Sequence, residues 1–162
     1  MTSATESLIE RFYGAFAVRD GDTMASCYGP DATFSDPVFP GLRGAEPGAM
    51  WRMLTGRAED LRVELLDHSA DEHSGTARWR AHYTFTQTGR PVVNEVEASF
   101  HFQDGLIAEH EDSFDFYRWC RQALGLRGLL LGWTPLVKNA VRRGAREGLD
   151  EFMARDAAGT PS

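Results

Sequence analysis

Apolar residues at intervals of three and four predict a helix near the start of the chain. This helix is expected over roughly residues 4–18, and Ser3 with Glu6 provides a capping box at its first turn. Its apolar face needs cover from another layer of the fold. That face consists of Leu8, Ile9, Phe12, Tyr13 and Phe16.

Two further helices are predicted before residue 60, with a short extended segment between them. We expect Asp22 to cap the first of these helices and Gly29-Pro30 to end it. Residues 32–36 then form an extended segment that the following prolines stop. Pro47 fits the first turn of the next helix.

The middle of the chain alternates between apolar and polar residues, which is typical of strands with one buried face. Strong turn signals at Thr88-Gly89 and Asp104-Gly105 separate the later strands. The expected strands cover residues 61–67, 77–86, 92–102 and 106–115. In the last strand, alternation assigns one face to Leu106, Ala108, His110, Asp112 and Phe114.

Helices followed by consecutive hairpin strands predict an α+β fold in which helices cover the apolar face of an antiparallel sheet. From Phe116 onward the pattern is helical again. We therefore expect one domain over residues 1–116, a helical extension packed on it over 117–156, and a disordered tail over 157–162.

The helical extension contains Leu129, Leu130, Leu131 and Trp133, which are too many apolar residues for one helix face. We expect this run to pack over the mouth of a pocket or against a second subunit. A membrane surface is the alternative, because Arg142, Arg143 and Arg146 follow nearby.

Charge is divided unevenly along the chain. The net charge of −7 argues against a nucleic-acid partner, which would require a basic surface. Residues 1–115 hold 20 acidic and 9 basic side chains, whereas residues 116–162 hold 4 acidic and 8 basic ones. We expect the basic tail to fold back on the acidic body and do not expect membrane contact. An anionic partner or membrane surface is the alternative.

The two cysteines, Cys27 and Cys120, lack the spacing of a disulfide framework or a zinc site. The chain begins without the basic and apolar regions of a signal peptide, and no 18 apolar residues follow one another. These features predict a cytoplasmic protein.

Two segments resemble the nuclear transport factor 2-like superfamily. The first, from residue 8, is LIERFYGAFAVRDGDTMASCYGPDATFSDPVFPGLRG, and the second, from residue 104, is DGLIAEHEDSFDF. Within the superfamily the chain is most similar to SnoaL-like polyketide cyclases and ketosteroid isomerases. The resemblance implies a cone-shaped α+β barrel, in which a curved antiparallel sheet wraps on the N-terminal helices. It also implies a pocket at the wide end and homodimers formed through the backs of the sheets.

Asp36 matches the position of the general base of the ketosteroid isomerases. Apolar surroundings would raise the proton affinity of its carboxylate, as a base requires. The alternative is that Asp36 caps the turn at Pro37. The chain departs from that family where its enolate is stabilised, because Phe12 and Ala98 occupy the matching positions and neither can donate a hydrogen bond.

His110 and Asp112 share the inner face of the last strand, where titratable groups need partners or a ligand. His110 can transfer a proton near neutral pH, while Asp112 either orients it or acts itself. In SnoaL-like cyclases the matching strand supplies acid and base groups. The alternative is a buried polar pair bonded to a helix backbone or to Tyr13.

Seven other side chains are candidates for lining the pocket, and the alternative for each is plain core. Asn94 can bond a carbonyl ligand or pair with Asp112. We expect no metal and no cofactor, because His82 and His101 point outward and no three ligands converge. Arg78 and Arg80 also point outward, unlike the Asp-Arg-Asp site of epoxide hydrolases with this fold. The pocket candidates are Tyr13, Phe34, Trp51, Trp79, Tyr83, Asn94 and Phe100.

These observations predict an enzyme that uses Asp36, His110 and Asp112 for general acid/base chemistry on an apolar polycyclic or terpenoid carbonyl compound. Isomerisation, cyclisation and hydration all fit this chemistry. The alternative is a non-catalytic protein that binds a small apolar molecule and contacts a partner or membrane through its C-terminal helices.

Overall fold

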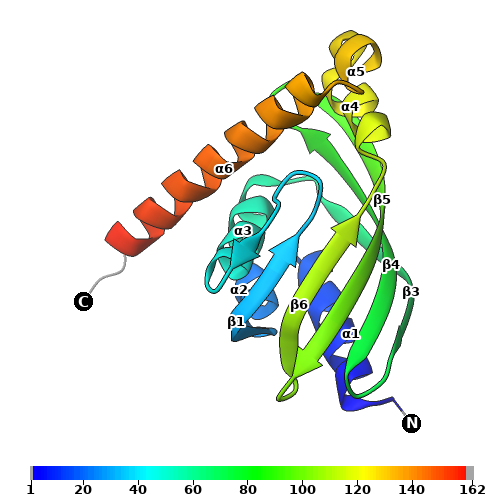
Figure 1. Cartoon of the computed structure of the whole chain (residues 1–162), viewed down its shortest axis with the longest axis vertical. Helices are drawn as coiled ribbons and strands as arrows, with labels where there is room; N and C mark the ends of the chain where they lie inside the picture. Colours follow the sequence, from blue (N-terminus) through cyan, green and yellow to red (C-terminus); the bar gives the residue numbers. More distant parts are fainter. Residues whose placement is uncertain (1, 160–162) are drawn as a thin grey trace.

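The computed structural model describes residues 2–159 and contains one curved sheet with helices on its concave side and at one end (Figure 1). The first third of the chain forms α1 (Ala4–Ala17), α2 (Gly21–Ser26), β1 (Tyr28–Ser35), β2 (Leu42–Arg43) and α3 (Glu46–Arg57). A meander follows, made of β3 (Arg62–Ala70), β4 (Ser74–Phe85), β5 (Arg90–Gln103) and β6 (Leu106–Ser113). The last elements are α4 (Phe116–Leu124), α5 (Leu126–Leu131) and α6 (Pro135–Ala158).

The capping box predicted for α1 is present. The Ser3 hydroxyl accepts a hydrogen bond from the Glu6 amide at 3.1 Å, and the Glu6 carboxylate accepts one from the Ser3 amide at 3.0 Å. The predicted cap of α2 is wrong. Asp20 caps this helix by accepting from the Thr23 amide, whereas Asp22 lies inside its first turn.

The predicted end of α2 is also wrong. This helix stops at Ser26, and Gly29-Pro30 belongs to β1. The pairing of β1 with β6 shifts register between Tyr28 and Thr33, and this irregular stretch accommodates a proline that has no N–H for the ladder.

The sheet has the strand order β2-β1-β6-β5-β4-β3 and does not close on itself. The neighbours from β3 to β6 are antiparallel, as the hairpin signals predicted. The expectation of a wholly antiparallel sheet is wrong, because β1 pairs with β6 in parallel. No hairpin links β1 to β6, so turn geometry does not dictate their relative direction. Their carboxyl ends therefore lie at the same end of the sheet.

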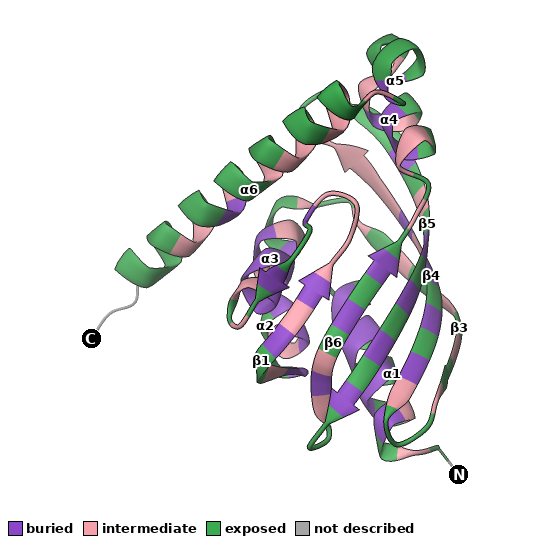
Figure 2. Cartoon of the chain, viewed as in Figure 1, coloured by how far each residue is buried: buried purple, intermediate pink, exposed green. Residues whose placement is uncertain are grey.

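The inward side chains of β4 and β5 pack on α1 and form most of the core. Buried and exposed residues alternate along these strands, which gives the stripes seen in Figure 2. In β5 the buried residues are Val92, Val96, Ala98, Phe100 and Phe102, as predicted, whereas Asn94 is half-buried.

One part of the predicted alternation in β6 is wrong. Phe102 pairs with Ile107 and His101 pairs with Glu109, so Ala108 is an extra residue in a β-bulge. The bulge turns Ile107 to the inside, where it is fully buried, although alternation had placed it outside. Beyond the bulge the predicted faces hold, and His110 and Asp112 are buried.

The C-terminal helices cover one end of the sheet. Helix α4 packs on β5 through a second apolar cluster of Val92, Trp119, Cys120 and Ala123. Helix α6 crosses the loop after β1, where the Arg142 guanidinium donates to the Pro37 carbonyl at 2.8 Å. Helix α6 also includes residues 157 and 158 of the tail that was expected to be disordered, and residues 160–162 lie outside the described part of the chain.

Candidate functional site

A line of hydrogen bonds runs through the core from α3 to β6. Trp51 Nε1 lies 2.8 Å from Tyr28 Oη, and Tyr28 Oη lies 2.7 Å from His110 Nδ1. His110 Nε2 lies 2.8 Å from Asp112 Oδ1. All four side chains are buried. We call this line the Trp51–Asp112 relay.

The indole of Trp51 fixes the direction of the first hydrogen bond, and one tautomer of His110 satisfies the other two. The indole N–H of Trp51 can only donate, so Tyr28 Oη accepts from it and donates its own proton to His110 Nδ1. His110 Nε2 then carries the proton that Asp112 Oδ1 accepts. This arrangement gives every group of the relay a hydrogen-bond partner.

Aromatic rings enclose His110 on several sides. Its ring centroid lies 4.3 Å from that of Phe100, 4.9 Å from that of Phe34 and 5.6 Å from that of Phe12. Both ring nitrogens already have partners in the relay. This packing orients His110 firmly and leaves neither nitrogen open to another molecule.

Asp36 lies beside Asp112 at the end of the sheet that α4 covers. Phe34 pairs with His110 and Ser35 with Glu111 in the parallel ladder, so the next step brings Asp36 alongside Asp112. Asp36 Oδ1 accepts from the amides of Val38 and Phe39 at 2.7 and 2.6 Å, so the turn cap suggested by the sequence is present.

The carboxyl group of Asp36 holds its proton unusually tightly. Burial raises its pKa from 3.8 to about 6, and the nearby charge of Asp112 adds to this effect. The two backbone N–H groups and His110 oppose the rise without cancelling it. A carboxyl group with a raised pKa thus lies next to a second carboxyl group.

Two buried donors near these carboxyl groups lack a hydrogen-bond partner among the described residues. They are the hydroxyl of Tyr13 on α1 and the indole N–H of Trp79 on β4. Their ring centroids lie 6.0 Å apart. Burial raises the pKa of Tyr13 well above its ordinary value, and the charge of Asp112 raises it further. Unpaired buried donors are uncommon in folded proteins, so these two groups call for an explanation.

The remaining candidates lie closer to α4. Tyr83 is half-buried and its hydroxyl accepts from Trp119 Nε1 at 2.7 Å. Asn94 is half-buried and lies opposite Ala81, whereas Asp112 lies opposite Ala98, four residues further along β5. The suggested pairing of Asn94 with Asp112 is therefore wrong.

The model for the SnoaL-like domain matches residues 9–110, which include most of α1 and most of the sheet. The chain belongs to the SnoaL-like family.

Several solved structures have the same fold. The LEH-like epoxide hydrolase of M. tuberculosis is 25% identical to this SnoaL-like chain, with a TM-score of 0.64 over 80% of this chain and 94% of the other. TsrD from Streptomyces laurentii is 26% identical, with a TM-score of 0.64 over 75% and 95%. A putative polyketide cyclase from Xanthomonas campestris pv. campestris is 21% identical, with a TM-score of 0.63 over 75% and 97%. No curated protein matches the chain.

Sequence reasoning placed His110 and Asp112 together but missed Tyr28. The misplaced end of α2 put Tyr28 in a helix, so its pairing with β6 could not be predicted. Tyr28 has the same parity as Ala32, Phe34 and Asp36, and this alternation was the available signal.

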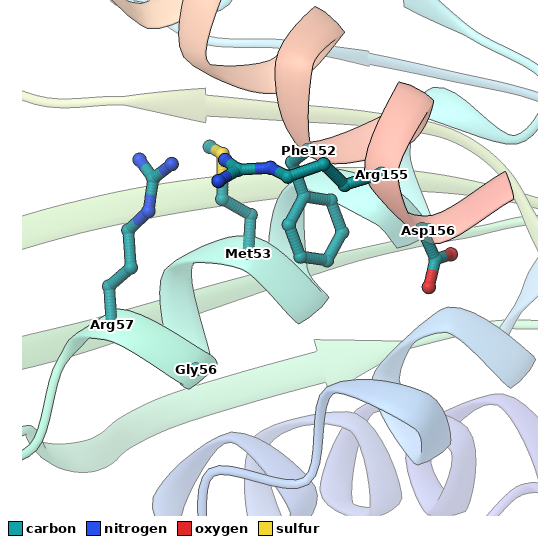
Figure 3. A pocket seen from close by; sticks show the side chains of 6 residues that line it. All are labelled: Met53, Gly56, Arg57, Phe152, Arg155 and Asp156. Carbon is teal, nitrogen blue, oxygen red and sulfur yellow. The ribbon is translucent and has the colours of Figure 1, made fainter. Parts of the chain in front are cut away.

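Two cavities of this SnoaL-like chain lie away from the two carboxyl groups, and the second is partly lined by His110. One of about 460 Å³ lies between α3 and α6, with walls that include Met53, Phe152 and Arg155 (Figure 3). Another of about 340 Å³ lies against β1, β2 and β6, and its polar lining includes His101 and Glu111. Neither includes Asp36 or Asp112, and the core beneath these residues is filled by aromatic side chains.

Other predicted features lie on the outer face. Arg80 pairs across strands with Glu95 at 2.7 Å, and Arg78 and His101 are exposed. Within residues 2–159, no three His, Cys, Asp or Glu side chains are grouped to hold a metal ion. In the same part of the chain, no helix has both the length and the apolar character needed to traverse a bilayer.

Proposed function

We propose that this SnoaL-like protein binds a small, largely apolar organic molecule at the α4 end of the sheet and transfers protons with Asp112 and Asp36. The observation that carries this proposal is the pair of adjacent carboxyl groups, one at the end of a buried relay and one with a pKa of about 6. The similar structures named as an epoxide hydrolase and a putative polyketide cyclase support small-molecule chemistry.

The two carboxyl groups take different roles in this mechanism. Asp112 is the base. His110 donates a hydrogen bond to its Oδ1, and its second oxygen remains to accept a proton from the substrate. Asp36 is the acid, since a carboxyl group with a pKa of about 6 is partly protonated near neutral pH and can give up its proton readily. His110 positions Asp112 and does not touch the substrate.

In this proposal Tyr13 and Trp79 hold the oxygen of the substrate, which requires the aromatic side chains that fill this part of the core to move aside. Their two unpartnered donors can both bind a carbonyl oxygen and stabilise the negative charge that develops when a neighbouring C–H loses its proton. They supply the donors that Phe12 and Ala98 lack at the positions matching the ketosteroid isomerases. The apolar surroundings favour a polycyclic or terpenoid carbonyl compound, and isomerisation, cyclisation or hydration follows from the same proton transfers.

Exchange of α-protons for deuterium tests this proposal without knowledge of the natural substrate. The wild-type protein and its Asp112→Asn and Asp36→Asn variants would be incubated with 2-tetralone, a bicyclic ketone, in D₂O and followed by proton NMR. We expect the wild type to accelerate exchange and both variants to lose about a hundredfold or more of that rate. Asp60→Asn, which alters an exposed carboxylate on the loop before β3, is the matched control and should exchange normally.

The rival function is binding without catalysis. It is favoured by the hydrogen bonds that Asp36 makes to the amides of Val38 and Phe39, because these alone give the residue a structural purpose. Quenching of tryptophan fluorescence by 2-tetralone measures binding separately. If the ketone binds and the wild type exchanges no faster than Asp112→Asn, the chain is a binding protein and the catalytic proposal fails.

We further propose a cytoplasmic homodimer formed through the outer face of the sheet. That face carries the cross-strand pairs Arg80–Glu95 and His82–Glu64. In a dimer, the basic residue of one copy can pair instead with the acidic residue of the other copy. Sedimentation equilibrium of the wild type and of Arg80→Glu tests the dimer. A monomeric wild type at micromolar concentration would contradict it, and cell fractionation tests the location.

A further inference from the structure

Large apolar side chains are exposed together on α5 and the residues that follow it. Six of them are between 48% and 75% exposed, and among the described residues only Val18 and Val93 are comparable. Exposed apolar groups are usually scattered, and a cluster of this size indicates a contact surface. We call this cluster the α5 tip, and it consists of Leu126, Leu129, Leu130, Leu131, Trp133 and Leu136.

The exposure of the α5 tip is built into the packing of the helix. A Cβ atom at Gly128 would lie only 1.9 Å from the Cys120 carbonyl oxygen, so the glycine face of α5 sits directly on α4. Gly132 also faces Cys120. Because the small residues occupy the inner face, the leucines must point away from the protein. Figures 1 and 2 show α5 projecting at one end of the molecule with its exposed residues outermost.

The α5 tip is held in a defined shape. The Tyr117 hydroxyl donates to the Leu129 carbonyl at 2.8 Å, and Trp133 Nε1 donates to the Leu130 carbonyl at 3.1 Å. Thr134 caps α6 immediately afterwards by accepting from the Val137 amide. These bonds present the apolar side chains as one surface.

The chain segment that contains the α5 tip carries charge of one sign. Residues 116–146 contain seven basic side chains and no acidic one, in a chain whose net charge is −7. Arg146 binds Glu46 and Asp150, and Arg142 binds the Pro37 carbonyl, so these two fold back as the sequence suggested. The exposed basic residues beside the tip are Arg118, Arg121, Arg127 and Arg143.

We propose that the α5 tip docks this protein on an anionic phospholipid bilayer. Leucines and a tryptophan at the front would enter the boundary between headgroups and acyl chains, while the surrounding arginines bind lipid phosphates. A symmetric dimer through the same surface would bring two stretches of seven basic residues together, and like charges oppose such a contact. The complementary surface is therefore an anionic one.

Vesicle co-sedimentation tests this docking. The full chain would be mixed with vesicles of phosphatidylglycerol and phosphatidylcholine in a one-to-three ratio, and with vesicles of phosphatidylcholine alone. We expect binding to the anionic vesicles, weak binding to the neutral ones, and loss of binding at high salt. Replacing Leu130 and Leu136 together by serine should weaken binding about tenfold. Replacing Arg127 and Arg143 together by glutamate should weaken it about 20-fold or more.

Tryptophan fluorescence gives an independent measure, because Trp133 is 73% exposed whereas Trp51, Trp79 and Trp119 are buried. Anionic vesicles should shift the emission of the wild type to shorter wavelength, and Trp133→Phe should abolish this shift while most binding remains. The matched control is Val18→Ser with Arg62→Glu, which changes one exposed apolar and one exposed basic residue far from α5. This control should bind as the wild type does.

Three results would overturn the proposal. One is failure of the wild type to bind anionic vesicles, and another is equal binding by the serine variant of Leu130 and Leu136. The third is a wild type that forms a dimer in sedimentation equilibrium and does not bind vesicles, together with a serine variant that is monomeric. That last result would assign the α5 tip to a second copy of the chain.

Discussion

The carboxyl group of Asp36 destabilises the folded chain when it is ionised, so replacing it by asparagine should stabilise the protein. Burial and the charge of Asp112 raise its pKa from 3.8 to about 6. The folded state therefore binds the proton more tightly than the unfolded state does. A group with a raised pKa gives its full stabilisation below about pH 3.8 and loses it as the pH rises through about 6.

The size of this effect follows from the two pKa values. The difference between 3.8 and about 6 corresponds to about 3 kcal/mol, at about 1.4 kcal/mol for each tenfold change in proton affinity. Asparagine keeps a side-chain oxygen to accept from the amides of Val38 and Phe39 and has no charge to bury. Asp36→Asn should therefore be about 2–3 kcal/mol more stable than the wild type at pH 8, and the difference should disappear near pH 4.

Urea unfolding followed by circular dichroism between pH 4 and pH 8 measures this difference. Asp60→Asn is a control of opposite sign, because hydrogen bonds from Thr84 lower the pKa of Asp60. That carboxylate stabilises the fold at neutral pH and ceases to do so as the pH falls. Asp60→Asn should therefore lower the free energy of unfolding only above the acid range. If Asp36→Asn proves less stable than the wild type at pH 8, ionised Asp36 is a structural cap and our account of its pKa is refuted.

Three further predictions concern the core and the first helix. Tyr28→Phe leaves Trp51 Nε1 and His110 Nδ1 without their partner and should lower the free energy of unfolding in urea by about 2–4 kcal/mol. The control Tyr117→Phe removes a more exposed hydroxyl and should lower it by under about 1 kcal/mol, and equal losses in the two variants would argue against the relay. Phe100→Ala should cost about 3–5 kcal/mol because the ring is fully buried, and a loss below about 1 kcal/mol would show that the site collapses or is already loose. Ser3→Ala removes the α1 cap and should lower the free energy of unfolding by about 1 kcal/mol, which thermal unfolding can detect.

Several features of the site were accessible from the sequence because they depend on local periodicity. The helical spacing of Phe12, Tyr13 and Phe16 predicted a buried face, and these residues are buried. Alternation in the last strand predicted that His110 and Asp112 share the inner face, and both are buried there. Asp36 was singled out by its match to the general base of the ketosteroid isomerases, and its place before Pro37 suggested the turn cap that it makes.

Other features depended on contacts that no local pattern encodes. The bond between Tyr28 and His110 joins residues 82 positions apart and requires β1 to lie in parallel beside β6. The bulge at Ala108 changed the face of Ile107, because one extra residue reverses the alternation of a strand.

The sequence by itself determined most of the helices and strands, and the apolar side of most of them, because these depend on spacing of 3.6 and 2 residues. Only the tertiary structure decided that Tyr28 completes the relay and that Asp36 lies beside Asp112, whose charge raises its pKa. It also decided that Gly128 packs on Cys120, so that the leucines of α5 face outward. Each of these outcomes is set by which surfaces meet in space. That choice depends on contacts over the whole chain, and no short segment contains it.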